Sequence, residues 1–262
     1  MQIWQAITLG AVQGFAEFLP VSSSGHLLLL QRLFGVEENA LFYSVMLHIG
    51  TLIPVFIVFF KEIISLFKKP FKKVLMLIVA TIPSALAGAF LGDYVDGFFY
   101  GDNLISAILL ALTFLLTATE LFFAERIEKK KINAFPLDYK RATAMGFAQA
   151  LAIVPGLSRS GTVISTGTFL KLDREENAKF TFLMSVPIIL GAALMSGYKS
   201  VKQGISVDIL PLVFGVVTSA VTGYIAIKTT LKTIKKANYK WFSLYLIVMA
   251  IVSIVAKTTF NV

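Results

Sequence analysis

The chain has 262 residues, of which 56% are hydrophobic and 15% are charged, and its formal net charge is +9. Soluble domains usually carry about 25% charged residues, so this composition argues against a soluble protein and for an integral membrane protein. The sequence contains no cysteine, which excludes disulfides, thiolate nucleophiles and cysteine-ligated metals. The first residues carry neither a basic segment nor a small-residue cleavage site, and we expect no signal peptide.

In chain order, the first element is a polar-interrupted segment at residues 3–34, which divides at the cluster Pro20–Gly25. A similar segment at residues 141–171 divides at Pro155–Gly161. The apolar pieces on either side of each break are too short to cross a hydrocarbon core of about 30 Å. We therefore predict that each segment is a re-entrant helix pair, because non-helical backbone persists at membrane depth only inside protein or beside a cavity.

Long apolar stretches follow each interrupted segment and approach the roughly 20 residues that a transmembrane helix needs. The clearest are Leu41–Phe60, Val74–Leu91, Leu104–Phe123, Ile209–Ile227 and Trp241–Val255. We predict six transmembrane helices, three after each interrupted segment. The membrane also accounts for the basic residues, so we expect a lipid bilayer as partner and no nucleic acid.

Basic residues concentrate in the short connections near 61–73, 124–141 and 229–240, whereas the connection at 93–103 is acidic. The positive-inside rule assigns the three basic connections to the cytoplasm and the acidic one to the outside. Alternation then assigns the connection near 199–207 to the outside. We expect both termini to lie on the external face of the plasma membrane.

The two halves of the chain repeat. A shift of 136 positions brings seven identical residues into register within twenty positions. The first members of these pairs are Ala6, Gly10, Gln13, Ala16, Ser22, Ser24 and Gly25. After a two-residue insertion, Glu37-Glu38-Asn39-Ala40 aligns with Glu175-Glu176-Asn177-Ala178. We predict two duplicated units, 1–123 and 141–262, joined by a basic cytoplasmic linker at 124–140.

Each predicted unit contains an odd number of spans, so the second unit begins on the opposite side of the membrane from the first. The expected fold is therefore an all-α integral membrane protein with an inverted-topology repeat, six transmembrane helices and two re-entrant helix pairs. The two pairs enter from opposite faces, and we expect their tips to meet near the middle.

The first tip carries a carboxylate in apolar surroundings. Gln13 and Glu17 share one helix face because they are four residues apart. A charged carboxylate within a membrane helix costs roughly 2.5 kcal/mol or more. Glu17 is therefore a candidate metal ligand or proton acceptor. The alternative is a structural carboxylate bonded to a neighbouring helix.

Ser22, Ser23, Ser24 and Gly25 follow this carboxylate and precede an apolar helix. Hydroxyls and free amides at a helix N-terminus suit a phosphate, although serine is also a common N-cap. His26 comes next and is a candidate acid, base or nucleophile. Its alternative role is a hydrogen bond to a backbone carbonyl.

The second tip contains Arg159, the only basic residue between Arg141 and Lys171. Arginine is planar and always charged, which suits it to gripping phosphate oxygens. An ion pair with Glu17 that locks the two tips together is compatible with that role. The candidate phosphate ligands beside it are Ser158, Ser160 and Gly161. By contrast, His48 lies within an apolar span, and we interpret it as structural.

At these tips the sequence resembles the undecaprenyl-diphosphate phosphatase family, also known as bacitracin-resistance proteins. The family motif Glu-or-Gln, three residues, Glu, then Pro-x-Ser-Ser-x-Gly-His is similar to residues 13–26, and Pro-Gly-x-Ser-Arg-Ser is similar to residues 155–160. Length, span count and repeat extend the resemblance over essentially the whole chain. Two positions depart from it: Gln13 stands where many members have glutamate, and Val163 where members usually have threonine.

The resemblance implies hydrolysis of a long-chain polyprenyl diphosphate to its monophosphate with a divalent cation, Mg²⁺ or Ca²⁺. The site would face outward, and the product lipid would return to cell-wall glycan synthesis. It also implies a catalytic set of Glu17, Ser23, His26 and Arg159, with Gln13 and Glu17 as metal ligands. By this resemblance the nucleophile is either Ser23 or His26, and the sequence does not choose between them. A homodimer is a further possibility that the sequence leaves open.

Two other classes share parts of this pattern. Type 2 phosphatidic-acid phosphatases also use Ser-Gly-His and Ser-Arg motifs, but they need a second histidine shortly after Ser-Arg, and this chain has none there. Inverted repeats with broken helices are typical of transporters. A polyprenyl-phosphate transporter therefore remains the alternative function.

Overall fold

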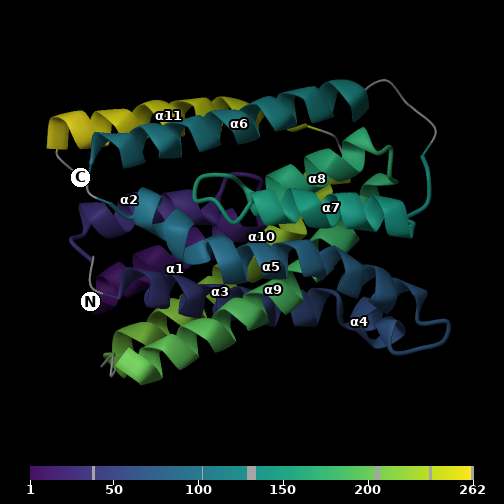
Figure 1. Cartoon of the computed structure of the whole chain (residues 1–262), viewed down its shortest axis with the longest axis horizontal. Coiled ribbons are helices and arrows are strands. Elements are labelled where there is room, and N and C mark those ends of the chain that lie inside the picture. The colour runs from purple at the N-terminus through teal and green to yellow at the C-terminus, as the bar shows by residue number, and fades with distance from the viewer. Residues whose placement is uncertain (37–38, 102, 129–133, 204–206, 236–237, 261–262) are drawn as a thin grey trace.

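The computed structural model describes residues 1–36, 39–101, 103–128, 134–203, 207–235 and 238–260. Within these ranges the regular structure consists of eleven α-helices. Most of them run along the long axis of one bundle (Figure 1). The bundle therefore has two ends, at the left and right of that view.

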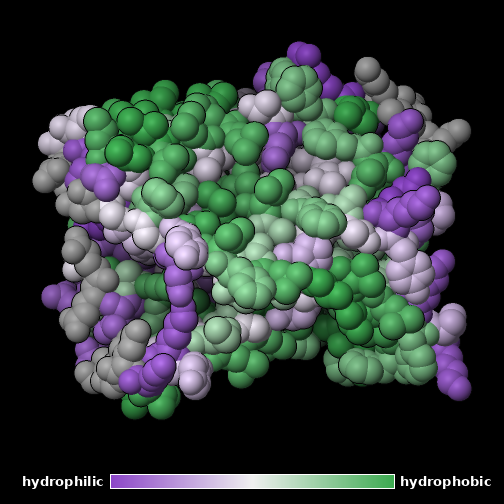
Figure 2. Space-filling model, viewed as in Figure 1, coloured by the Kyte–Doolittle hydropathy of each residue, from purple (hydrophilic) through white to green (hydrophobic). Residues whose placement is uncertain are grey.

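Six of the helices are long and apolar enough to cross a membrane, as predicted. They are α3 (Ala40–Val58), α5 (Lys72–Phe99), α6 (Leu104–Glu128), α9 (Arg174–Gln203), α10 (Ile209–Lys235) and α11 (Lys240–Phe260). Large apolar side chains point outward from them, such as Phe90, which is 72% exposed. Figure 2 shows hydrophobic residues across the middle of the molecule, with hydrophilic residues mainly toward its two ends. This surface suits a multi-pass protein that meets lipid instead of water.

Four short helices form two pairs inside the bundle. The first pair is α1 (Ile3–Phe18) and α2 (Ser23–Leu33), and the second is α7 (Tyr139–Leu151) and α8 (Arg159–Phe169). The two 11-residue helices, α2 and α8, are each about 16 Å long at 1.5 Å per residue. Neither of these two is long enough to cross a hydrocarbon core alone.

Each pair is closed at its base by one hydrogen bond at corresponding positions of the two halves. Gln5 Nε2 donates to Phe34 O at 3.0 Å, and Arg141 Nε donates to Leu170 O at 3.3 Å. Each base bond joins the start of one helix to the end of its partner, so each pair returns to the end of the bundle from which it begins.

Polar contacts gather at the end of the bundle that holds the first pair's base. The amino terminus of Met1 lies 4.0 Å from Asp208 Oδ2, and Lys199 Nζ lies 2.5 Å from Asp93 Oδ1. The end of α11 reaches the same end of the bundle (Figure 1). Because these contacts join the start of α1, the end of α5, the end of α9 and the start of α10, those segments share one end.

A second set of polar contacts gathers at the opposite end, where α7 begins. Lys179 Nζ lies 3.3 Å from Glu62 Oε1, and Arg174 pairs with Glu128. The short helix α4 (Phe60–Leu66) lies here, in a segment that the sequence analysis treats as a connection. The basic connections predicted to share one face of the membrane, as far as the structure describes them, lie at this end.

The helix pairs pack by close backbone approach at equivalent glycines. A Cβ on Gly10 of α1 would lie 2.3 Å from Gly215 O of α10. A Cβ on Gly146 of α7 would lie 2.4 Å from Ala80 O of α5. Only glycine fits at such distances. Each pair thus lies against the second long helix of the other half, and α6 packs against α11.

Some boundaries differ from those predicted. Asp93 and Asp96 lie in the last turns of α5, and Lys199 and Lys202 lie on α9, rather than in connections. The apolar pattern marks only the lipid-facing part of a helix, whereas backbone hydrogen bonds continue into the polar region beyond it. Two predicted features lie outside the described residues: the pair Glu37-Glu38, and residues 129–133 of the basic linker.

Candidate active site

The tips of the two helix pairs meet inside the bundle. A Cβ on Gly25 would lie 3.0 Å from Gly156 Cα, so the two backbones are in contact. Ser160 Oγ donates a hydrogen bond to Leu19 O across the same junction at 3.1 Å. Both α2 and α8 begin here, and helix N-termini carry partial positive charge. The expected meeting of the tips is therefore found, and it joins two helix N-termini.

A cavity of about 240 Å³ lies beside this junction. Its polar wall brings together side chains from four helices and one cap: Glu17, Ser22, Ser23, Ser24, His48 and Arg159. The remaining wall is mostly apolar and includes Val45, Ile188 and Ile189, with Ser84 and Gln149 as its polar members. A small polar pocket with an apolar wall suits the head of an amphiphile.

Glu17 is the centre of the polar wall and is only 5% exposed. Its Oε1 pairs with Arg159 Nη2. Its Oε2 accepts hydrogen bonds from Gln13 Nε2 at 2.9 Å and from Ser23 Oγ at 2.8 Å. His48 Nε2 lies 3.3 Å from the same oxygen. A carboxylate offers about four lone-pair sites, and four partners from α1, α2, α3 and α8 surround this one.

His48 also faces Glu17. Its Nδ1 lies 2.7 Å from Ser44 O, which can only accept, so Nδ1 carries a hydrogen. Its other ring nitrogen faces a carboxylate, which also accepts. The contact is a hydrogen bond when Nε2 also carries a hydrogen. The structure thus places His48 in the site, although its position in an apolar span favours a structural role.

The serine cluster begins its helix earlier than predicted. Ser22 is the N-cap of α2, and Ser23, Ser24 and Gly25 form the first turn. The Ser22 hydroxyl accepts from Gly25 N at 3.3 Å. This hydroxyl satisfies one of the amides that a helix N-terminus leaves unpaired. Ser22 therefore has a capping role, and Ser23 is the serine that bonds to the carboxylate.

The second tip repeats this cap with one difference. Ser158 accepts from Gly161 N at 3.1 Å, but its φ is −69°, whereas Ser22 has a φ of 67°. A positive φ is costly for serine and indicates a constraint from surrounding structure. Ser158, Ser160 and Gly161, predicted as phosphate ligands, do not line the cavity, and neither does Gly25. The strained backbone thus lies only in the tip that carries Ser23.

His26 is bonded to this strained residue. Its backbone N and its ring Nδ1 both bond to Ser22 O, at 3.3 and 2.7 Å. The carbonyl only accepts, so Nδ1 carries the proton and Nε2 accepts from Tyr245 OH at 2.6 Å. Tyr245 also stacks on the imidazole ring. His26 does not line the cavity, and both of its ring nitrogens are engaged within the protein.

The predicted metal ligands do not fit a protein-held cation. Mg²⁺ and Ca²⁺ take oxygen ligands, with one or more carboxylates. The oxygens of Glu17 are already bonded to donors, and Gln13 turns its nitrogen, not its oxygen, toward that carboxylate. Among the described residues, no group of three or more His, Cys, Asp or Glu gathers to hold a metal. No step of the mechanism is therefore assigned to a cation on these residues.

A family model described as "Bacitracin resistance protein BacA" matches residues 6–252 of this chain. The chain belongs to the BacA family. Among the proteins similar to this BacA-family chain, the undecaprenyl-diphosphatase of Carboxydothermus hydrogenoformans is 39% identical over 98% of both chains. The undecaprenyl-diphosphatase of Thermodesulfovibrio yellowstonii is 38% identical over 92% of this chain and 94% of its own. Undecaprenyl-diphosphatase 4 of Bacillus thuringiensis is 39% identical over 97% of both.

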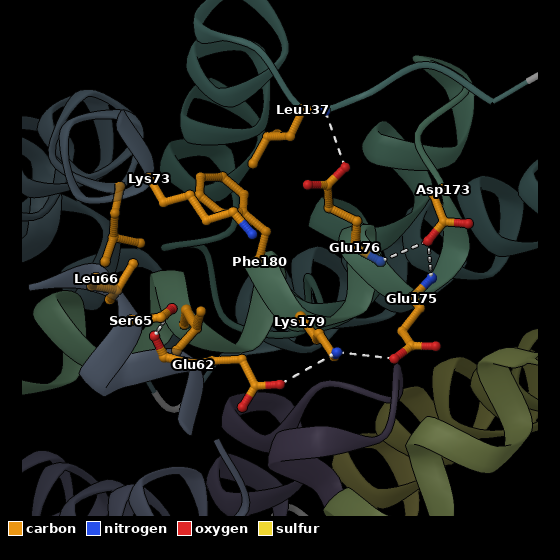
Figure 3. Close-up of a pocket in the computed structure, with 12 residues that line it drawn as sticks. Glu62, Ser65, Leu66, Lys73, Leu137, Asp173, Glu175, Glu176, Lys179 and Phe180 are labelled. Atoms are coloured by element: carbon orange, nitrogen blue, oxygen red, sulfur yellow. Dashed lines mark hydrogen bonds and ion pairs between the residues drawn. The ribbon is translucent and has the colours of Figure 1, made fainter. Parts of the chain in front are cut away.

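Another cavity of this BacA-family protein, of about 260 Å³, lies where α4, α5 and α9 meet. Figure 3 shows that its acidic side chains are engaged in structural contacts. Asp173 caps the N-terminus of α9, and Glu176 accepts from Leu137 N at 3.1 Å. Lys179 bridges Glu62 and Glu175. These contacts join α4 and the segment before α7 to the start of α9, so this cavity is a structural joint and not the candidate site.

Proposed function

We propose that this BacA-family protein hydrolyses undecaprenyl diphosphate to undecaprenyl monophosphate and inorganic phosphate, and so returns the lipid carrier to cell-wall synthesis. One observation carries the proposal: Ser23 bonds to a buried carboxylate that also pairs with Arg159 beside an amphiphilic cavity. The relatives support it, since they are named for the same diphosphatase reaction. Transport as the alternative finds no support among those names.

In the proposed first step, Ser23 Oγ attacks the terminal phosphorus of the diphosphate. The bond from that phosphorus to the bridging oxygen breaks, and the prenyl monophosphate leaves. The proton of Ser23 passes to Glu17 across their 2.8 Å hydrogen bond. Arg159 turns from Glu17 to the phosphate oxygens, whose geometry matches its paired N–H groups. The covalent product is phosphoserine at position 23.

Of the two nucleophiles left open by the sequence, the geometry favours Ser23. Ser23 lines the cavity and already has a proton acceptor. His26 is bonded on one side to Ser22 O and on the other to Tyr245. We assign His26 the role of a positioning residue, because it holds the strained Ser22 that directs Ser23 toward Glu17. His48 accepts or supplies the proton that Glu17 exchanges.

A divalent cation remains a proposed cofactor, but as a partner of the substrate and not of Glu17. Mg²⁺ is commonly bound through substrate phosphates with few protein ligands. A diphosphate offers such oxygens by itself. The saturated carboxylate of Glu17 supports this form of the proposal.

Phosphate release from undecaprenyl diphosphate by the purified protein in detergent tests the function. We expect turnover without a sealed membrane, a lower rate with a chelator, and recovery when excess Mg²⁺ is restored. An enzyme needs no compartments, whereas a transporter does. The proposal fails if detergent-solubilised protein releases no phosphate while the same preparation moves the lipid across sealed vesicles.

We also propose that the fold is an inverted-topology repeat of units 1–123 and 141–262, with two re-entrant pairs. Three observations support it: the equivalent base bonds, the glycine contacts at equivalent positions, and the exchange of partners between α1 with α10 and α7 with α5. In this arrangement the end that holds Asp93 and the start of α1 faces outward. Both termini are then external, and the cavity receives its substrate from that face.

Labelling of single cysteines tests this orientation, and the chain has no native cysteine to interfere. Asp93→Cys replaces a side chain that is 80% exposed at the proposed outer end. We expect an impermeant maleimide to label it in intact cells, while Lys69→Cys is labelled only after permeabilisation. The reverse pattern would invert the orientation and put the substrate's entry on the cytoplasmic side.

A further inference from the structure

Gln149 lines the cavity and carries an unpaired acceptor oxygen, whereas the groups that would grip a phosphate are donors. The residue is 2% exposed and lines the same cavity as Ser23 and Arg159. Its Oε1 is shielded from solvent and has no hydrogen-bond partner among the described residues. An unpaired buried oxygen is costly, so a native one calls for a functional explanation.

The orientation of this amide is determined by its neighbours. Gln149 Nε2 lies 3.0 Å from Ser84 Oγ. Ser84 Oγ in turn donates its hydrogen to Thr81 O at 3.0 Å, so its lone pair is what faces Gln149. The amide nitrogen therefore points toward Ser84, and the oxygen is the atom left without a partner. The hydrogen bonds from Gln149 to Ser84 and from Ser84 to Thr81 hold the amide in this orientation.

We propose that Gln149 positions the water that hydrolyses the phosphoserine intermediate, an inference that rests on the function proposed above. Phosphate oxygens only accept when ionised, so a bare acceptor repels them and does not form a phosphate subsite. Water is a donor and fits an amide oxygen. A glutamine that orients the attacking water is an established device in phosphoryl transfer.

The second step balances with the residues already described. The water oxygen attacks the phosphorus on Ser23, and the bond from that phosphorus to Ser23 Oγ breaks. Ser23 Oγ takes back the proton that Glu17 holds from the first step. Both hydrogens of the water remain on the product, dihydrogen phosphate, and one of them donates to Gln149 Oε1 during the attack. Glu17 is then again a carboxylate, ready for the next turnover.

The repeat gives an internal comparison. Gln13 is the counterpart of Gln149 in the first half, and it turns its nitrogen onto Glu17 at 2.9 Å. Gln13 does not line the cavity, whereas Gln149 does. Both leave Oε1 unpaired among the described residues, but Gln13 bonds through its nitrogen to Glu17, whereas Gln149 bonds to Ser84 and lines the cavity.

Rapid-quench kinetics of Gln149→Leu with undecaprenyl diphosphate tests the inference. Loss of water positioning slows only the second step. We expect a burst of about one equivalent of undecaprenyl monophosphate per protein, then steady-state turnover about tenfold or more below wild type. Phosphoserine at position 23 should accumulate to a higher level than in wild type and be detected by mass spectrometry of the quenched protein.

Two further variants keep the test sharp. Ser84→Ala removes the anchor of the amide but leaves Gln149, so it should give the same burst in weaker form if Gln149→Leu does not fold. Gln31→Leu is the matched control. Gln31 is also 2% exposed and also has an unpaired Oε1 among the described residues, yet it lies outside the cavity. It should show no added burst.

The outcomes separate this inference from the function on which it rests. If the burst and the steady-state rate fall together in Gln149→Leu and phosphoserine does not accumulate, while wild type forms it, Gln149 is structural and the inference is overturned. If neither protein forms phosphoserine and Ser23→Ala still turns over, the covalent mechanism itself is wrong. A burst with accumulated phosphoserine supports both.

Discussion

Ser23→Ala is expected to abolish phosphate release, with a loss of about 10⁴-fold or more, because the attacking oxygen is gone. His26→Gln is expected to slow turnover about 10²-fold, the scale of a misplaced reacting group. The difference follows from the contacts: Ser23 bonds to Glu17 in the cavity, whereas His26 bonds to Ser22 O and Tyr245. The measurement is kcat for both variants with undecaprenyl diphosphate.

A matched control and a trapping experiment accompany this comparison. Ser253→Ala removes a buried hydroxyl whose bond, among the described residues, lies within its own helix, to Ala250 O at 2.8 Å, and it should keep wild-type turnover. Trapped phosphoenzyme should be stable to acid, as phosphoserine is. An acid-labile, base-stable adduct would mean phosphohistidine, and His26 would then be the nucleophile.

Arg159→Lys is expected to lower kcat/KM by about 10²- to 10³-fold while the protein still folds and inserts. Lysine keeps the charge that pairs with Glu17 but loses the planar fork that matches phosphate oxygens. The measurement is kcat/KM together with the thermal unfolding of the purified variant. A variant that unfolds like wild type but turns over slowly identifies Arg159 as a phosphate clamp. A variant that keeps its turnover identifies Arg159 as a counter-charge to Glu17.

Arg141→Lys serves as the control, because Arg141 is the other arginine of the second helix pair. It bonds to Asp138 and to Leu170 O at the base of that pair, away from the cavity. We expect it to keep turnover within a few-fold of wild type. If Arg159→Lys keeps near wild-type kcat/KM, Arg159 acts only as an ion-pair partner of Glu17 and does not grip the phosphate through its paired N–H groups.

The sequence predicts the parts of the site that depend on motif and repeat. Glu17, the serine cluster and Arg159 stand out by their chemistry, the resemblance singles out Ser23, and the ion pair between Glu17 and Arg159, considered as an alternative role for the arginine, is present. The repeat placed the two tips opposite each other, and Gly25 meets Gly156 there. These features follow from local pattern and from the pairing of two similar segments, which is why one sequence suffices to find them.

The sequence does not predict contacts made by side chains on distant helices. The sequence favours a structural role for His48, although a polar group in an apolar span is itself costly, and that cost is the available signal. The direction of His26 depends on Tyr245, which is 219 residues away along the chain. A tyrosine near a membrane interface is common and carries no specific signal. Such partners are determined by packing, not by spacing.

In the resting protein the carboxylate of Glu17 occupies the guanidinium of Arg159 and so competes with the substrate's phosphate for it. A phosphate can take the guanidinium only by displacing the carboxylate that already holds it, so part of the binding free energy goes into breaking that pair. The displaced carboxylate then loses one partner on Oε1, while Ser23 remains bonded to Oε2. Substrate arrival thus frees the proton acceptor at the moment when it is needed. The pair therefore lowers the affinity for the diphosphate, so Glu17→Gln, which leaves Arg159 free for phosphate, should tighten binding of a non-hydrolysable diphosphate even as turnover falls.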